Sequence, residues 1–180
     1  MNKLNSLATT ITLPLMALAT IGSFERLEAA NTVTVVCDST TAIPTVTATF
    51  STAEPSTPKS YKASQTTEIL SFLPEYFAPD TALQECQKTA NSLQKYYSNH
   101  KMNYLASDTI EGQPVVCAVE RRGVSCDSYN SEILFALKQK VNPTQMLYDM
   151  LGGNFKDAQV PASRTVSRIY TDLRPSWWPF

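Results

Sequence analysis

The residues with the most distinctive chemistry are the four cysteines, because a thiol can form a disulfide, bind a metal or act as a redox nucleophile. They are Cys37, Cys86, Cys117 and Cys126. No two of them form the closely spaced C-x-x-C pair that zinc sites and thioredoxin-like centres use. The spacing therefore favours structural disulfides, provided that the chain enters an oxidising compartment.

Other groups that could carry catalysis are few. The one histidine, His100, follows a predicted helix, where a cation is favourable for plain electrostatic reasons. Ser107, Asp108, Ser125 and Asp127 supply hydroxyls and carboxylates, but no nucleophile elbow accompanies them and turn chemistry explains them. The acidic residues lack the spacing of an EF-hand loop. We therefore predict no catalytic residue, no metal site and no cofactor.

The first thirty residues have the order of a secretory signal, in which a charge precedes a short apolar run. Lys3 is followed by an apolar stretch over residues 7–21 that threonines and Pro14 interrupt. A membrane-spanning helix needs about 20 apolar residues, so this stretch is too short to span. We expect cleavage after Ala29 or Ala30. An uncleaved anchor is the main alternative, and a buried core helix is a lesser one.

Export makes disulfides the expected state of the cysteines. Four cysteines allow three connectivities. Cys117 and Cys126 flank Arg121-Arg122-Gly123, a turn candidate that would place their sulfurs opposite each other in a hairpin. Cys37 and Cys86 then pair by elimination. That bond closes a loop of about 50 residues, which stabilises the fold by about 4 kcal/mol in the chain-entropy model.

Composition limits the rest of the chain to one domain with appendages. The 180 residues are 43% hydrophobic, which is enough for a core. The 15 basic residues against 16 acidic ones leave no excess of positive charge for binding a nucleic acid. We expect a signal peptide over residues 1–30, a four-cysteine domain over 31–155 and a tail over 156–180. The sequence does not indicate an oligomeric state.

The hydrophobic pattern predicts an α+β fold in which an antiparallel β-sheet packs on one main helix. The helix should begin at Thr81, where Gln84 completes a capping box, and run to about Ser98. A second short helix is expected over 143–151, between Pro143 and a glycine pair. The sequence predicts strands over 32–37, 46–50, 67–72, 103–107, 113–119 and 133–137, turns at 111–112 and 122–123, and a loop over 56–65.

One apolar stripe on the main helix should face the sheet. Leu83, Cys86, Ala90, Leu93 and Tyr97 repeat at helical spacing and form this stripe. Four residues fall off it and should be solvated, namely Glu85, Lys88, Asn91 and Lys95.

The combined pattern resembles a known family. Cys37, the helical ALQECQ of 82–87, NYL of 103–105, GQPVVC of 112–117 and Cys126 before ILFALK of 133–138 are similar to the circadian oscillating protein domain of cyanobacteria, over about residues 35–152. Glu111 stands where that family usually has asparagine. The resemblance implies an extracytoplasmic, membrane-associated protein, with an abundance that follows the day cycle in some members and no known catalytic residue.

The C-terminal segment could contact a membrane. Residues 156–180 carry four basic and two acidic residues and end in Trp177-Trp178-Pro179-Phe180. Aromatic and basic side chains are the groups that hold a peripheral protein at anionic lipid. The alternative is that the aromatics fold back on the domain. The candidate contact residues are Arg164, Arg168, Arg174, Trp177, Trp178 and Phe180.

These observations lead to two hypotheses. The first is a non-catalytic exported module, in the periplasm, in the thylakoid lumen or secreted, that is peripheral to a membrane or binds a membrane protein. The second is a small secreted enzyme or ligand carrier whose site assembles from residues distant in sequence; this requires a deep pocket with convergent polar groups.

Overall fold

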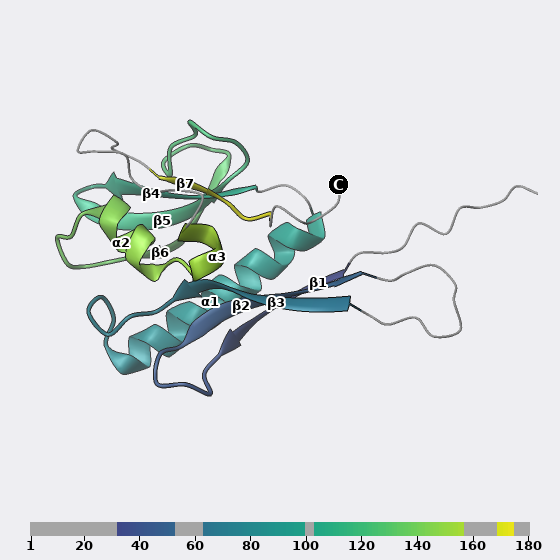
Figure 1. Cartoon of the computed structure of the whole chain (residues 1–180). Coiled ribbons are helices and arrows are strands. Elements are labelled where there is room, and N and C mark those ends of the chain that lie inside the picture. The colour runs from purple at the N-terminus through teal and green to yellow at the C-terminus, as the bar shows by residue number, and fades with distance from the viewer. Residues whose placement is uncertain (1–31, 53–62, 100–102, 157–168, 175–180) are drawn as a thin grey trace, which may run out of the picture.

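The fold is α+β, as predicted, with two antiparallel sheets and a long helix. The computed structural model describes residues 32–52, 63–99, 103–156 and 169–174. Sheet A has the strand order β1-β2-β3 and sheet B the order β6-β5-β4-β7. Figure 1 shows sheet B above sheet A, with α1 running diagonally from the lower left to the upper right. In chain order the elements are β1 (Thr32–Asp38), β2 (Thr45–Thr52), β3 (Ala63–Ser71), α1 (Pro79–Asn99), β4 (Tyr104–Ile110), β5 (Gln113–Val119), β6 (Ser131–Ala136), α2 (Pro143–Met150), α3 (Gly153–Lys156) and β7 (Tyr170–Asp172).

The expectation of a single sheet is corrected to two, and α1 accounts for the division. The helix contacts β1 and β2 of sheet A and β6 of sheet B. Each sheet has an apolar face, and burying both faces in one core requires two layers. Phe72, Phe77 and Phe135 meet within this core with ring centroids 5.1 to 5.6 Å apart. A contact between aromatic rings from both halves of the chain therefore helps to join the layers.

Strand β2 of sheet A alternates between a buried and an outward face. Val46, Ala48 and Phe50 of β2 point inward and are at most 1% exposed. The residues between them are Thr47 and Thr49, which face outward. β3 begins at Ala63, so the last residues of the predicted loop over 56–65 belong to a strand instead. The first residues of β3 are mostly polar, and its large apolar residues, Ile69 and Leu70, lie near its end. The sequence therefore did not indicate a strand at 63–65.

The main helix begins two residues earlier than predicted. Pro79 occupies the first helical position, where its fixed φ suits the helix and its missing N–H costs nothing. The backbone N–H of Ala82 donates to Ala78 O, so Thr81 lies inside the first turn and the predicted capping box is wrong.

The buried face of α1 is turned slightly from the predicted stripe. Ala82 is buried where Leu83 was expected, and Leu83 is 36% exposed. Cys86, Ala90 and Leu93 are buried as predicted. Tyr97 is half-buried, and Glu85, expected in solvent, is half-buried as well. The other side chains expected in solvent are exposed, namely Lys88, Asn91 and Lys95.

Sheet B is built from two hairpins and one short added strand. β4 and β5 are joined by Glu111 and Gly112, whose φ values are 51° and 78°. Positive φ at both central residues is characteristic of a type I′ turn, in which Asn-Gly is the favoured pair. The predicted turn is therefore confirmed, and Glu111 is held in a conformation that its side chain disfavours.

The second short helix starts where the sequence predicted. The Asn142 side chain accepts hydrogen bonds from the backbone N–H groups of Thr144 and Gln145, and Pro143 follows this cap. The helix ends at Met150 rather than at residue 151, because Leu151 leaves it to pair with Leu70 of β3. The end of α2 is thus attached to the edge of sheet A.

Replacing Leu93 with alanine should lower the free energy of unfolding by about 2 to 5 kcal/mol, because its side chain is 0% exposed and a cavity would remain. Urea denaturation of the two proteins measures this. The matched control is Leu83→Ala on the same helix, which should cost less than about 1 kcal/mol since that side chain already contacts water. Equal losses would mean that the buried face of α1 is wrongly assigned.

Replacing Glu111 with asparagine should stabilise the protein by about 1 kcal/mol, since asparagine tolerates a left-handed backbone better. Thermal unfolding would report this as a higher midpoint. Glu120→Asn removes the same charge at an exposed position without a positive φ and serves as the control. A destabilised Glu111→Asn variant would contradict the assigned turn.

Candidate functional site

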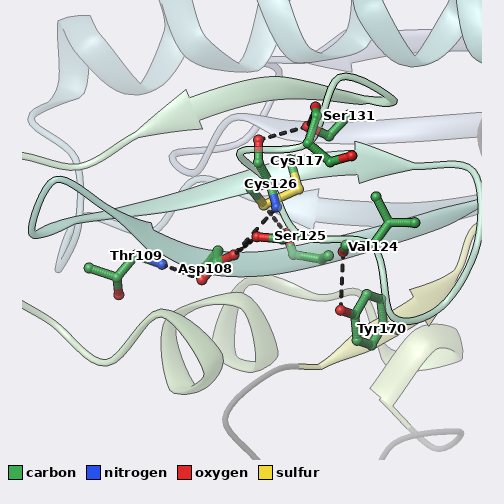
Figure 2. Close-up of a disulfide and its surroundings, with 10 residues drawn as sticks. Asp108, Thr109, Cys117, Val124, Ser125, Cys126, Ser131 and Tyr170 are labelled. Atoms are coloured by element: carbon green, nitrogen blue, oxygen red, sulfur yellow. Dashed lines mark hydrogen bonds between the residues drawn. A yellow bond between two sulfur atoms is a disulfide. The ribbon is translucent and has the colours of Figure 1, made fainter.

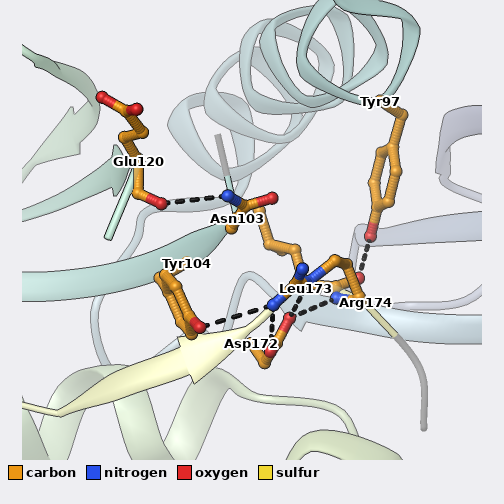
Figure 3. Close-up of polar contacts among 7 residues, drawn as sticks. All are labelled: Tyr97, Asn103, Tyr104, Glu120, Asp172, Leu173 and Arg174. Atoms are coloured by element: carbon orange, nitrogen blue, oxygen red, sulfur yellow. Dashed lines mark hydrogen bonds and ion pairs between the residues drawn. The ribbon is translucent and has the colours of Figure 1, made fainter. Parts of the chain in front are cut away.

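The described end of the chain, residues 170–174, forms the root of the C-terminal tail. β7 pairs with β4 through Tyr170, Thr171 and Asp172. The next residue, Leu173, is 1% exposed, and its backbone N–H donates to Asn103 O at 2.8 Å. The Tyr97 hydroxyl donates to Leu173 O at 2.5 Å, as Figure 3 shows. Residues 170–172 of the predicted tail are therefore a strand of sheet B.

Arg174 is engaged by the body of the protein. Its Nε and Nη2 atoms each lie 3.0 Å from a carboxylate oxygen of Asp172, and Nη2 lies 3.4 Å from the Tyr104 hydroxyl. Figure 3 shows these contacts converging at the end of β7. The hydrogen bonds that the Arg174 guanidinium donates to Asp172 raise its pKa above its ordinary value. The ion pair compensates the charge of this arginine.

The Tyr104 ring contacts a second guanidinium from a distant segment. Arg122, in the turn after β5, has its Cζ 5.3 Å from the ring centroid, and Cζ of Arg174 lies 5.8 Å from it. Both distances are within the range of a cation–π interaction. Acidic groups accompany these cations, since Asp172 pairs with Arg174 and Glu120 is exposed beside Arg121. The root is therefore a polar surface of mixed charge, on which Arg121 and Arg122 are exposed.

Tyr97 connects this root to the main helix. Burial, and then the negative charge of Asp172, raise the pKa of its hydroxyl, which therefore stays protonated and able to donate. The sequence pattern predicts Tyr97 only as an apolar contact on the main helix. Its hydrogen bond to Leu173 O was not predictable, because the partner lies 76 residues away and is a backbone carbonyl.

The turn that carries Arg122 belongs to a loop over residues 120–130 that a disulfide closes. Cys117 and Cys126 are bonded with Cα atoms 5.6 Å apart. Asp108 accepts hydrogen bonds from the Ser125 hydroxyl at 2.7 Å and from the Cys126 N–H at 3.3 Å (Figure 2). The Tyr170 hydroxyl donates to Val124 O at 3.1 Å. Ser125 and Asp108, considered as catalytic groups from the sequence, thus hold this loop on sheet B.

The second disulfide joins α1 to the edge of sheet A. Cys37 of β1 and Cys86 of α1 are bonded with Cα atoms 5.6 Å apart, across 49 residues of sequence. Both predicted pairs are confirmed. Beside this bond, Gln94 Oε1 accepts from the Val35 N–H at 2.7 Å, and its Nε2 donates to Val33 O at 3.1 Å. The amide of Gln94 therefore makes the hydrogen bonds to β1 that a neighbouring strand would make.

Metal ligands and membrane-spanning helices are the next features that bear on function. Within the described residues, no three side chains of the His, Cys, Asp and Glu types lie close enough together to hold a metal ion. None of the described helices is long and apolar enough to cross a membrane. Among the predicted contact residues, only Arg174 lies within the described part of the chain. The other five lie outside it, namely Arg164, Arg168, Trp177, Trp178 and Phe180. His100 also lies outside the described residues.

Comparison with known proteins gives one match. The model of the family described as circadian oscillating protein COP23 matches residues 36–177, which include all four cysteines. No curated protein and no solved structure matches the chain. The match extends beyond the sheets to Trp177 and includes the whole root of the tail.

Removing the two disulfides separately should have unequal effects. In the chain-entropy model, Cys37→Ala with Cys86→Ala should cost about 4 kcal/mol, and Cys117→Ala with Cys126→Ala about 3 kcal/mol. The first bond closes the longer loop, at 49 residues against 9. Guanidinium denaturation of the two double variants gives the values. A larger loss from the second pair would show that local hydrogen bonding at the loop outweighs loop entropy.

Proposed function

Since the chain belongs to the circadian oscillating protein COP23 family, we propose that it is a non-catalytic exported module that attaches peripherally to an anionic membrane surface through its C-terminal tail. The proposal includes a cyanobacterial origin, a cleaved signal segment and an abundance linked to the day cycle. The alternative of a membrane-bound protein partner would use the same tail. The observation that supports attachment is the fixed position of Leu173 and Arg174 on sheet B, just before the two tryptophans.

Export is supported by the cysteines. All four form disulfides, which persist in oxidising compartments such as the periplasm, the thylakoid lumen or the cell exterior. The apolar stretch over residues 7–21 precedes the whole described domain. An oxidising, extracytoplasmic environment accounts for both observations.

Attachment is supported by the position of the tryptophans relative to the root. Leu173 is buried and Arg174 is ion-paired, so the chain leaves sheet B at a fixed point. Trp177 and Trp178 follow within four residues, a distance of at most about 14 Å along the chain. Two adjacent indoles can bury apolar area at the headgroup level without spanning the bilayer. A tail with a fixed origin loses less conformational freedom on binding than a free one.

The basic residues of the tail supply the electrostatic part. Arg174 and Asp172 compensate each other, which leaves Lys156, Arg164 and Arg168 against Asp157. Each basic residue close to anionic lipid contributes about 1 kcal/mol, and salt screens this contribution within a Debye length. At the root, the exposed Arg121 and Arg122 add further positive charge beside the tail, next to one exposed acidic residue, Glu120. Binding should therefore have a salt-sensitive part from the arginines and a salt-resistant part from the tryptophans.

A sedimentation assay with phosphatidylglycerol and phosphatidylcholine vesicles tests this division. The chain should begin at Asn31, and β7 must be kept, because deleting all of 164–180 would remove a strand of sheet B. Arg164→Gln with Arg168→Gln should weaken binding to anionic vesicles about thirtyfold at low salt, equivalent to about 2 kcal/mol. Trp177→Ala with Trp178→Ala should abolish the binding that remains at high salt.

Two matched controls separate local from global effects. Lys138→Gln with Lys140→Gln removes the same charge from exposed positions after β6. Tyr129→Ala removes a fully exposed aromatic from the disulfide loop. Both controls should bind as the unchanged chain does. Equal sedimentation of the tail variants and the unchanged chain would contradict the proposal, and binding to native membranes but not to lipid vesicles would point to a protein partner.

A further inference from the structure

An open polar pocket lies beside β3, far in sequence from the tail. Its volume is about 280 Å³, and its lining comes from Thr66, Thr67 and Glu68 of β3 and from Gly153 and Asn154 of α3. Two segments more than 80 residues apart therefore form it, as the ligand-carrier hypothesis requires, although the pocket is open and not deep. We propose that this pocket and the row of hydroxyls leading from it bind a neutral saccharide.

The wall of the pocket is fixed by a close approach of two backbones. Gly152 N–H donates to Ile69 O at 3.0 Å, and Leu151 pairs with Leu70. A Cβ at position 152 would lie 2.0 Å from Glu68 O, so only glycine allows α3 to begin this close to β3. The polar groups of α3 are thereby held against the edge of the sheet.

The polar groups of the pocket have hydrogen-bonding capacity to spare. Asn154 Nδ2 donates to Thr67 Oγ1 at 2.6 Å, which orients the amide and leaves its carbonyl oxygen for a donor. The carboxylate of Glu68 is exposed and has no hydrogen bond or ion pair with other described residues. The pocket thus offers a carboxylate and an amide oxygen as acceptors, and hydroxyls that can both donate and accept.

The chemistry of the lining selects a class of ligand. An apolar molecule would leave these polar groups unpaired, and an anion would be repelled by Glu68. A metal ion would find only one carboxylate. Sugar hydroxyls both donate and accept, so they can satisfy the carboxylate, the amide and the hydroxyls at once. The volume lies just below the range of typical ligand pockets, which suits one sugar unit.

A row of hydroxyls extends the pocket across sheet A. Thr66 pairs in register with Thr49 of β2, which pairs with Thr34 of β1. All three face outward, and the Thr66 and Thr49 hydroxyls share a hydrogen bond of 2.9 Å. Neighbouring strands lie about 4.8 Å apart, so the row presents hydroxyls at regular intervals. The high β-propensity of threonine explains its presence in strands, but it explains neither Asn154 nor the open carboxylate at the end of the row.

NMR titration of the ¹⁵N-labelled chain with glucose, maltotetraose and cellotetraose tests the proposal. Glucose should shift the amide signals of the pocket residues, and at least one tetrasaccharide should extend the shifts to Thr49 and Thr34. Millimolar affinity is expected for a site without aromatic stacking, and the tetrasaccharide should bind at least about tenfold more tightly than glucose. Equal affinity for glucose and both tetrasaccharides would contradict the role of the row.

Variants make the test specific. Asn154→Ala should weaken binding at least about tenfold, whereas Asn91→Ala, which removes an exposed amide from α1, should leave it unchanged. Glu68→Gln should retain part of the sugar affinity, because glutamine keeps a hydrogen-bonding oxygen. Complete loss of sugar binding in this variant, together with binding of a simple amine by the unchanged chain, would show that the ligand is a cation. No saturable shift from any of the three sugars up to about 50 mM would overturn the proposal.

Discussion

The structure depends on the attachment of α1 to β1. The Cys37–Cys86 bond joins the helix to the first strand, and Gln94 pairs with the backbone of that strand two turns later. The Gln94 amide satisfies backbone groups at the edge of sheet A, where an exposed strand would otherwise invite pairing with another chain. Because α1 also contacts β6, fixing the helix on sheet A positions sheet B as well. A small domain can gain from this covalent bond stability that its core alone would not supply.

Much of this fold follows from local sequence. The Cys117–Cys126 pair, the Glu111-Gly112 turn and the start of α2 depend on residue types and short spacings, and these predictions are confirmed. The Cys37–Cys86 pair, which follows from the first pair by elimination, is confirmed as well. The start of α1 was misplaced because Thr81 and Gln84 form a good capping pattern, yet Pro79 and the exposed first turn allow the helix to begin earlier. The sequence thus contains two possible helix starts, Pro79 and Thr81, and the folded protein uses the earlier one.

Features that depend on contacts between distant residues were not predictable. β7 has three residues, too few for an alternation to be recognised, and it is a strand only because β4 offers an edge. Glu68 and Asn154 likewise carry no sequence signal as a pair. Their proximity follows from Gly152, which could be read from the sequence only as a helix stop. The division into two sheets has the same origin, since it depends on which faces α1 covers.

We propose that a short tail with a fixed origin contacts the membrane, and fractionation of the host's membranes tests this most directly. Membranes carrying the unchanged protein or the Trp177→Ala, Trp178→Ala variant would be washed with high salt and then with alkaline carbonate. We predict that the unchanged protein remains after the salt wash and is released by carbonate, as expected for a peripheral protein with an apolar contact, whereas the variant is released by salt alone. Recovery of the unchanged protein in the soluble fraction at low salt would contradict peripheral attachment, and retention of both proteins after carbonate would show that another segment anchors the chain.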